Sequence, residues 1–203
     1  MSGARALFLD RDGTLMEEVD YCADPAKVRV YPGVPEALRR IKQAGWRTFI
    51  VTNQSGIGRG LMTEAQYRAV QDELSRQLGA DLVDAVYFCP DMPGTPSTRR
   101  KPAPGMVLEA AAEHGIDLPN SFLVGDKSSD IECGQRAGVR TILVLTGYGA
   151  QQRCSPDFVA TDFPHAVAFA LQPPNARGPG GAERPPSTRP EEGYFPARTP
   201  GRR

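Results

Sequence analysis

The sequence predicts an α/β fold, a doubly wound parallel sheet with helices on both faces. Short apolar runs, such as residues 6–9 and 48–52, are typical of strands that are buried on both sides. Longer segments with apolar residues at helical spacing separate these runs, so strand and helix alternate along the chain. This alternation favours right-handed crossovers between neighbouring parallel strands.

The expected elements follow one another in order. Residues 15–31 are expected to form a loop or small hairpin, a flap over the end of the first strand. A helix is expected to begin near Pro35 and to end at Gly45, and the Thr-Glu-Ala-Gln capping box at Thr63 begins the next helix. The other expected elements are strands over 85–89, 121–125 and 141–145, helices that end near 115 and span about 129–137, and an edge strand and helix within 157–171.

The chain is expected to hold one folded domain and a tail. Residues 1–171 form the expected domain, and neither 15–46 nor 53–100 contains enough further elements for a separate cap domain. Residues 172–203 contain eight Pro, five Gly, and six Arg against three Glu. Such a segment cannot bury enough apolar surface to offset its ordering entropy, so we expect it to be disordered.

Composition argues against several classes of protein. The chain has 24 basic and 24 acidic residues, so it lacks the positive excess of a nucleic-acid-binding protein. Its four cysteines form no CxxC pair, which argues against a disulfide framework or a cysteine-built zinc site. The apolar run before Asp10 is too short for a signal peptide, and no stretch is long enough to span a membrane. We therefore expect a cytoplasmic monomer that binds neither nucleic acid nor membrane.

Two carboxylates end the first predicted strand. Asp10 and Asp12 stand where open α/β sheets bind their ligands. Residues i and i+2 of an extended chain face the same side, so both carboxylates can converge, and Arg11 is expected to point the other way as a structural residue. Close carboxylates repel unless a cation or a shared proton offsets them. The pattern favours a metal-dependent site over a plain polar turn or a calcium loop, whose glycine would stand two positions later.

Further polar residues follow the other predicted strands. Thr52 and Asn53 come after the second strand, Lys101 lies in the loop after the third, and Asp126 follows the fourth. Asp130, four residues later, could position the lysine or begin a helix. Clustered carboxylates suit Mg²⁺, whereas an ammonium, a hydroxyl and backbone amides suit phosphate oxygens. A phosphate ester with magnesium is the ligand that uses both groups.

These motifs resemble those of the haloacid dehalogenase superfamily of phosphatases. They stand here as Asp10-Arg11-Asp12-Gly13-Thr14, Thr52-Asn53, Lys101 and Gly125-Asp126-Lys127-Ser128-Ser129-Asp130. The resemblance covers residues 6–150. More narrowly, the stretches Asp-Arg-Asp-Gly-Thr, Thr-Asn-Gln-Ser-Gly-Ile, Arg-Lys-Pro-Ala-Pro-Gly-Met and Val-Gly-Asp-Lys are similar to those of the heptose bisphosphate phosphatases, with the histidinol-phosphate phosphatases as close relatives.

The resemblance implies a covalent mechanism. Asp10 would be the nucleophile that forms an aspartyl-phosphate, and Asp12 would protonate the leaving alkoxide and then activate water. Thr52 and Lys101 would stabilise the transferring phosphoryl group. Mg²⁺ would be held by Asp10, the backbone carbonyl of Asp12, and Asp126.

The resemblance also implies a substrate and the residues that bind it. The expected reaction is removal of the 7-phosphate of D-glycero-D-manno-heptose 1,7-bisphosphate. The alternatives are a phosphatase of histidinol phosphate or another small phosphate monoester, and a non-catalytic phosphate-binding scaffold. The expected substrate-binding residues are Glu18, Tyr21, Asn53, Gln54, Ser55, Arg100 and Lys127, the last with simple solvation as its alternative.

One departure from the family pattern concerns a structural zinc ion. The relatives usually hold zinc in the loop after the third strand through Cys-x-His and a later Cys-x-Cys. Here Cys89 remains, but Asp91, Ser97 and Arg99 stand at the other three positions. We therefore predict that the chain has no structural zinc and that the prolines of residues 90–104 stiffen the loop instead.

Overall fold

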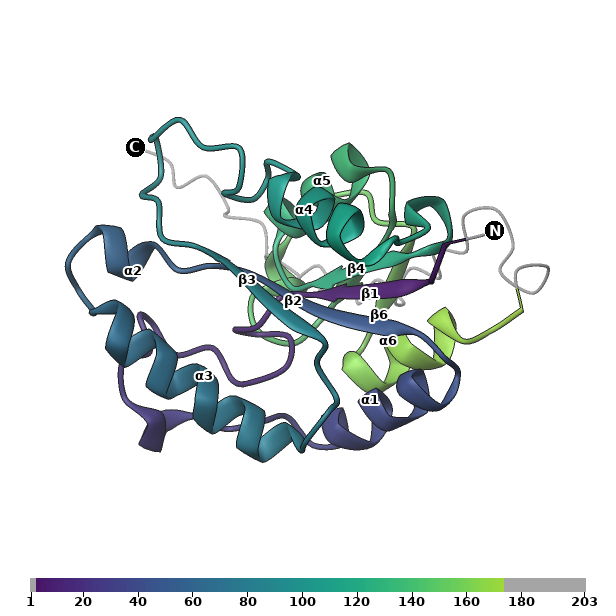
Figure 1. Cartoon of the computed structure of the whole chain (residues 1–203), viewed down its shortest axis with the longest axis horizontal. Coiled ribbons are helices and arrows are strands. Elements are labelled where there is room, and N and C mark those ends of the chain that lie inside the picture. Colours follow the sequence, from purple (N-terminus) through teal and green to yellow (C-terminus); the bar gives the residue numbers. More distant parts are fainter. Residues whose placement is uncertain (1–2, 174–203) are drawn as a thin grey trace, which may run out of the picture.

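The computed structural model describes residues 3–173 of the 203-residue chain. Its centre is a six-stranded sheet with the order β3-β2-β1-β4-β5-β6, in which every pair of neighbours is parallel (Figure 1). The strands are β1 Ala6–Leu9, β2 Arg47–Asn53, β3 Ala85–Cys89, β4 Phe122–Gly125, β5 Arg140–Val144 and β6 Phe158–Ala160. The predicted α/β fold is thereby confirmed. The expected tail lies outside the described residues, apart from Gln172 and Pro173.

The chain reverses its direction across the sheet next to β1. It runs outward from β1 through β2 to β3, and then returns to pair β4 with the other side of β1. Such a switch point opens a crevice between the loops that follow two central strands. Asp10 follows β1 and Asp126 follows β4, so both acids stand at this crevice.

Helices cover both faces of the sheet (Figure 1). Helices α1 Val34–Gln43, α3 Glu64–Leu78 and α6 Phe163–Ala170 lie on one face, and α4 Gly105–His114 and α5 Ser128–Ala137 lie on the other. Leu7 and Leu9 of β1 pack into the core under the first group, whereas Ala6 and Phe8 pack into the core under the second. This alternation is the period of two expected for a strand that is buried on both faces.

Local sequence signals set the helix starts. Helix α1 has a proline in its first turn, as predicted, and it buries Leu38 and Ile41. At the start of α3, the hydroxyl of Thr63 accepts from the backbone N–H of Gln66 at 3.2 Å, and Gln66 Oε1 accepts from the Thr63 N–H at 2.8 Å. The predicted capping box is therefore confirmed. Within residues 3–173, no helix has both the length and the apolar character that a membrane span requires.

A short helix, α2 Ser55–Gly58, follows β2 and was not predicted from the sequence. Its glycines argued against a helix in the sequence, because glycine disfavours helix interiors. The structure shows why they are there: a Cβ atom on Gly56 would lie 2.8 Å from Met62 Cε, and one on Gly58 would lie 2.5 Å from the carbonyl oxygen of Pro90. The glycines thus allow close packing beside the crevice.

The segment between β1 and α1 forms the expected flap. Met16 and Val30 pair across it as an antiparallel bridge, and one turn of 3₁₀-helix, η1 Pro25–Lys27, packs against α3. The flap is joined to the molecule at both ends and by this contact. It therefore forms a wall of the crevice rather than a separate cap domain.

Asp84 fixes the start of β3 against β2. Its carboxylate accepts hydrogen bonds from the backbone N–H of Thr48 at 2.8 Å, from Lys42 Nζ at 2.6 Å and from Arg47 Nη1 at 2.7 Å. Burial opposes its ionisation, but these hydrogen bonds outweigh burial and lower the pKa of Asp84 to about 2. The carboxylate therefore stays ionised in the folded protein in acid that would protonate an exposed Asp.

We expect Asp84→Asn to lower the free energy of unfolding by about 1–2 kcal/mol near neutral pH, because a charged acceptor of four hydrogen bonds is lost. The pKa of Asp84 is lower in the folded than in the unfolded chain. Its contribution is therefore complete above about pH 4 and disappears as the pH falls toward 2. Urea unfolding at a series of pH values measures the difference, with Asp72→Asn on the exposed side of α3 as the control. A difference that does not shrink in acid would contradict this account.

Candidate active site

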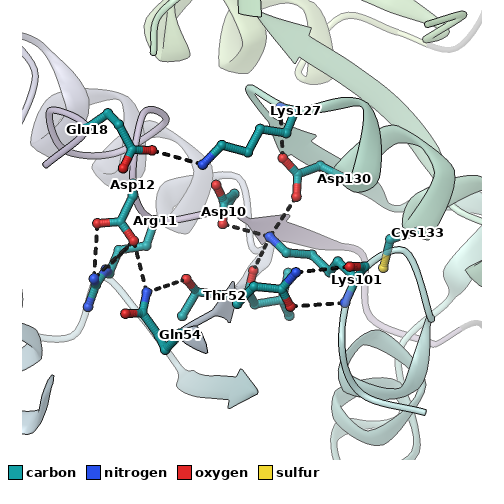
Figure 2. A network of polar contacts seen from close by, with 12 residues as sticks. Asp10, Arg11, Asp12, Glu18, Thr52, Gln54, Lys101, Lys127, Asp130 and Cys133 are labelled. Carbon is teal, nitrogen blue, oxygen red and sulfur yellow. Dashed lines mark hydrogen bonds and ion pairs between the residues drawn. The ribbon is translucent and has the colours of Figure 1, made fainter. Parts of the chain in front are cut away.

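The crevice at the switch point collects the residues of all four motifs (Figure 2). A cavity of about 310 Å³ opens between the flap, α2 and the loop of residues 90–104. A smaller cavity of about 40 Å³ is lined by Asp10, Asp12, Thr52, Asn53, Lys101, Lys127, Ser129 and Asp130, several of which line the larger one too. The four residues predicted to be catalytic thus meet at one small cavity.

Lys101 places a buried ammonium group at the centre of the site. Its Nζ lies 2.6 Å from Asp10 Oδ1, 2.7 Å from Asp130 Oδ1 and 2.8 Å from the carbonyl oxygen of Val51. Burial alone would lower the pKa of Lys101, but the charges of Asp10 and Asp130 outweigh burial and raise it above its ordinary value. The side chain therefore carries a fixed positive charge.

Asp10 is the acid that this charge keeps ionised. Burial opposes ionisation, whereas the charges of Lys101 and Lys127 favour it and lower the pKa of Asp10. The backbone N–H of Asp10 donates to the carbonyl of Val124 at 2.9 Å, so the residue continues the ladder between β1 and β4. An ionised carboxylate on a fixed backbone is what a nucleophile at this place requires.

Asn53 holds the loop that carries Lys101. Its Nδ2 donates to the carbonyl of Lys101 at 3.0 Å, and its Oδ1 accepts from the backbone N–H of Lys101 at 3.0 Å. Asn53 also lines both cavities, where the sequence places it as a substrate-binding residue. The structure shows a second role for Asn53 that the sequence did not predict. Both polar groups of its side chain fasten the loop that carries Lys101 to β2.

Asp126 supplies an oxygen atom that lacks a partner. One oxygen each of Asp10, Asp126 and Asp130 lies within 4.8 Å of the others. Asp126 is fully buried, and its Oδ2 accepts from the backbone N–H of Tyr148 at 2.9 Å, while its Oδ1 has no hydrogen-bond partner in the described part of the chain. Burial, and then the charge of Asp10, raise the pKa of Asp126 to about 8. A divalent cation would stabilise such a carboxylate.

Two glycines make room around this carboxylate. A Cβ atom on either Gly13 or Gly147 would lie 2.2 Å from Asp126 Oδ2. Both glycines also have a positive φ, of 81° and 53°, which residues other than glycine rarely adopt. The turns after β1 and β5 are therefore shaped to fit closely around Asp126.

Asp130 supports the two lysines of the site. Its Oδ1 pairs with Lys101 at 2.7 Å, and its Oδ2 accepts from the backbone N–H of Lys127 at 3.0 Å, which also closes the first turn of α5. The sequence left open whether this residue positions Lys101 or begins a helix, and it does both. Because both oxygens are engaged, Asp10 and Asp126 remain as the side chains that best fit Mg²⁺.

Arg11 does not point away from the site, so that prediction is wrong. Its Nε and Nη2 donate to the two carboxylate oxygens of Asp12, each at 3.0 Å. The prediction assumed that the chain stays extended, but the chain already turns here. The backbone N–H groups of Leu15 and Met16 donate to the Arg11 carbonyl at 3.0 and 3.2 Å. Strand alternation therefore no longer sets the direction of the arginine.

The larger cavity holds the residues that the sequence assigns to substrate. Its lining includes Glu18, Tyr21, Asn53, Gln54, Ser55, Arg100 and Lys127. Lys127 Nζ pairs with Glu18 at 2.9 Å and lies 4.9 Å from the ring centre of Tyr148. Tyr148 also lines this cavity and was not predicted from the sequence, although it follows β5 at the same edge of the sheet, where strand ends gather ligands.

Three of the four positions at which relatives carry zinc ligands still lie together. Cys89 Sγ is 3.3 Å from Asp91 Oδ2 and 3.6 Å from Ser97 Oγ. The fourth residue, Arg99, pairs with Glu109 at 3.4 Å, and a guanidinium cannot ligate a cation. Hydrogen bonds between side chains thus hold the loop at this point, and the absence of structural zinc stays a prediction.

Known proteins resemble this chain along most of its length. Residues 98–166 match a family model described as HAD-hydrolase-like. The D-glycero-D-manno-heptose-1,7-bisphosphate 7-phosphatases of Thermosynechococcus vestitus and Chlorobaculum tepidum are 39% and 38% identical, over 81% and 87% of this chain and 94% and 100% of those proteins. The chain belongs to this family of HAD-like phosphatases.

A solved structure extends the similarity of this phosphatase to the fold. The crystal structure of D,D-heptose 1,7-bisphosphate phosphatase from B. bronchiseptica, complexed with magnesium and phosphate, matches with a TM-score of 0.76 and 34% identity. The match covers 83% of this chain and 98% of that one. Magnesium in that relative agrees with the donor set of Asp10 and Asp126 in the present chain.

We expect Mg²⁺ binding by this phosphatase to release a proton below about pH 8, because Asp126 must ionise when the cation takes its free oxygen. The affinity for Mg²⁺ should therefore rise with pH and level off above about 8. Isothermal titration calorimetry in buffers of different ionisation enthalpy measures the released protons. Asp126→Asn, as the matched control, should bind Mg²⁺ weakly and release none. Binding without proton release by the unaltered protein would contradict the expected protonation state.

We expect the purified phosphatase to contain far less than one zinc ion per chain. A zinc-selective chelator should leave its melting temperature unchanged, because hydrogen bonds among Cys89, Asp91 and Ser97 hold the loop. Elemental analysis and thermal unfolding with and without the chelator measure both quantities. Stoichiometric zinc would show that the loop still binds metal.

Proposed function

We propose that this chain is a magnesium-dependent phosphatase that removes the 7-phosphate of D-glycero-D-manno-heptose 1,7-bisphosphate through an aspartyl-phosphate on Asp10. The observation that carries the proposal is the state of Asp10, a buried and ionised carboxylate that contacts the ammonium of Lys101 and lies near Asp126, one oxygen of which has no hydrogen-bond partner within residues 3–173. The activity named for the two relatives described above supports the choice of substrate.

The reaction proceeds in two half-reactions. In the first, an Asp10 oxygen attacks phosphorus, the bond from phosphorus to the sugar oxygen breaks, and the Asp12 carboxyl gives its proton to that oxygen. In the second, water attacks phosphorus, the bond to Asp10 breaks, and Asp12 takes a proton from the water. Asp12 is suited to both transfers because its side chain is 13% exposed and lines the same small cavity as Asp10.

Groups that are fixed before the substrate arrives stabilise the developing negative charge. Lys101 supplies a buried positive charge, and the hydroxyl of Thr52 lines the same cavity. Asp10, Asp126 and the backbone carbonyl of Asp12 would hold magnesium, which would supply positive charge to the phosphate oxygens. These groups need little reorganisation during the reaction.

The larger cavity contains a cation, Arg100, that can bind a second phosphate of the substrate. Arg100 lines that cavity but not the small cavity around Asp10, so its charge is available to a group other than the transferring phosphate. Its Nη1 donates to the carbonyl of Asp91 at 2.8 Å, which orients the guanidinium. Histidinol phosphate has no second phosphate for this residue. The arrangement therefore favours a bisphosphate.

We also propose that residues 1–171 carry the whole activity, as a monomer in the cytoplasm. The last helix within the described residues, α6, ends at Ala170, and the strands, both cores and the site of the described part lie within residues 3–171. The chain covers nearly the full length of its relatives.

We expect kcat/KM for one anomer of heptose 1,7-bisphosphate to exceed that for other esters by about a hundredfold or more, which is about 2.7 kcal/mol of discrimination. The comparison esters are fructose 1,6-bisphosphate, histidinol phosphate and a 3′-phosphorylated oligonucleotide. Magnesium-dependent phosphate release measures all of them, and Asp10→Asn should reduce release to the background. A flat, slow profile would leave the chemistry and remove the heptose assignment, whereas binding without release would favour a scaffold.

A further inference from the structure

Two side chains to which this reaction gives no catalytic role hold the Asp12 carboxyl. Arg11 donates from Nε and Nη2 to both carboxylate oxygens at 3.0 Å, and Gln54 Nε2 donates to Oδ2 at 2.9 Å (Figure 2). A bidentate guanidinium fixes the plane of a carboxylate as well as its distance. With the amide added, the Asp12 carboxylate is held from two directions.

Arg11 is buried in a way that a residue in a simple turn would not require. Its side chain is 1% exposed, and its guanidinium lies 5.5 Å from the ring centre of Tyr67. Its Nη1 has no hydrogen-bond partner within residues 3–173. Burial of a guanidinium with one unsatisfied nitrogen costs free energy, which an exposed arginine would avoid. In return, the buried guanidinium makes a bidentate contact with the Asp12 carboxylate, which we call the Arg11 fork.

Gln54 links Asp12, which carries the proton, to Thr52, which faces the transferring phosphoryl group. Its Nε2 lies 2.9 Å from Asp12 Oδ2 and 2.9 Å from Thr52 Oγ1. The backbone N–H of Gln54 donates to the carbonyl of Cys89 at 2.7 Å, so the residue continues the pairing of β2 with β3. The amide that contacts Asp12 is therefore carried by the rigid sheet.

We propose that Arg11 and Gln54 are positioning residues that hold the Asp12 carboxylate for proton transfer from water in the second half-reaction. This inference rests on the proposed phosphatase reaction. Between the half-reactions, Asp12 has given its proton to the sugar oxygen while Asp10 carries the phosphoryl group, so two anionic groups stand close together. The Arg11 guanidinium offsets this charge. Its two hydrogen bonds and the one from the Gln54 amide keep the Asp12 carboxylate in the wall of the small cavity.

The leaving group separates the two half-reactions experimentally. An aryl phosphate such as p-nitrophenyl phosphate releases a stable anion, so its first half-reaction does not need the Asp12 proton. The second half-reaction is the same for every substrate, because water always attacks the same phosphorylated Asp10. Loss of the Arg11 fork should therefore slow only the second step with an aryl phosphate, and phosphorylated enzyme should accumulate.

We expect Arg11→Lys, which keeps the charge but loses the fork, to lower kcat and KM for the heptose bisphosphate together by about 10- to 100-fold and to leave kcat/KM nearly unchanged, because only the second half-reaction is slowed. Rapid mixing with p-nitrophenyl phosphate should then give a burst of p-nitrophenol that approaches one per site, larger than that of the unaltered enzyme. Arg68→Lys on α3, where the arginine side chain is 65% exposed, is the matched control and should change neither quantity.

A second variant tests the inference if Arg11→Lys does not fold. Gln54→Leu removes the amide and should give a burst of the same kind. In an Asp12→Asn background the proton carrier is absent, so adding Gln54→Leu should change kcat by less than about twofold. A loss of kcat/KM with the aryl phosphate, the absence of a burst, or further losses in the Asp12→Asn background would overturn the inference. An unaltered protein that hydrolyses no phosphate ester would instead overturn the proposed function.

Discussion

The ammonium group of Lys101 is the contact on which the rest of the site depends. It joins the carboxylates of Asp10 and Asp130 and the carbonyl of Val51, so one loop residue is bound to β1, β2 and α5 at once. Without this cation the buried acids would repel one another, and without the acids a buried cation would be unstable. The parallel sheet brings the acids together, and the Asn53 amide brings the lysine to them. The same contacts therefore hold the fold and the site.

The position of this cation gives two neighbouring acids different charge states. Burial opposes ionisation of both, but Asp10 touches Lys101 and its pKa is lowered, whereas Asp126 faces the Asp10 anion and its pKa is raised. Separation of the pKa values of adjacent carboxyls is how one site assigns them different tasks. Asp10 is ionised before a substrate arrives, and Asp126 becomes fully ionised when a cation binds. Lys101 thus keeps Asp10 ionised, and burial together with the Asp10 charge raises the pKa of Asp126.

The fold and the place of the site could be predicted because they depend on regular elements. Apolar runs identify the strands, and a parallel sheet gathers its strand ends whatever the loops contain. Alternation correctly placed Asp10 and Asp12 at one cavity, but it failed for Arg11, where the chain has begun to turn. The clamp of Asn53 on the backbone of Lys101 joins residues 48 positions apart, so no local pattern reveals it. Turns and long-range polar contacts depend on packing, which periodicity does not describe.

The contacts in the walls of the larger cavity are weaker than those in the small cavity around Asp10. Glu18 and Lys127 form one ion pair at 2.9 Å with side chains 21% and 36% exposed, whereas Lys101 and Asp10 are 2% and 7% exposed. A partly exposed pair contributes little stability, so Lys127 can exchange Glu18 for another anionic group at small cost. Buried contacts that perform chemistry cannot be exchanged in this way, because removal of one partner leaves an unpaired charge. The strand ends can therefore keep phosphoryl transfer unchanged while the flap and the loop of residues 90–104 vary to select the substrate.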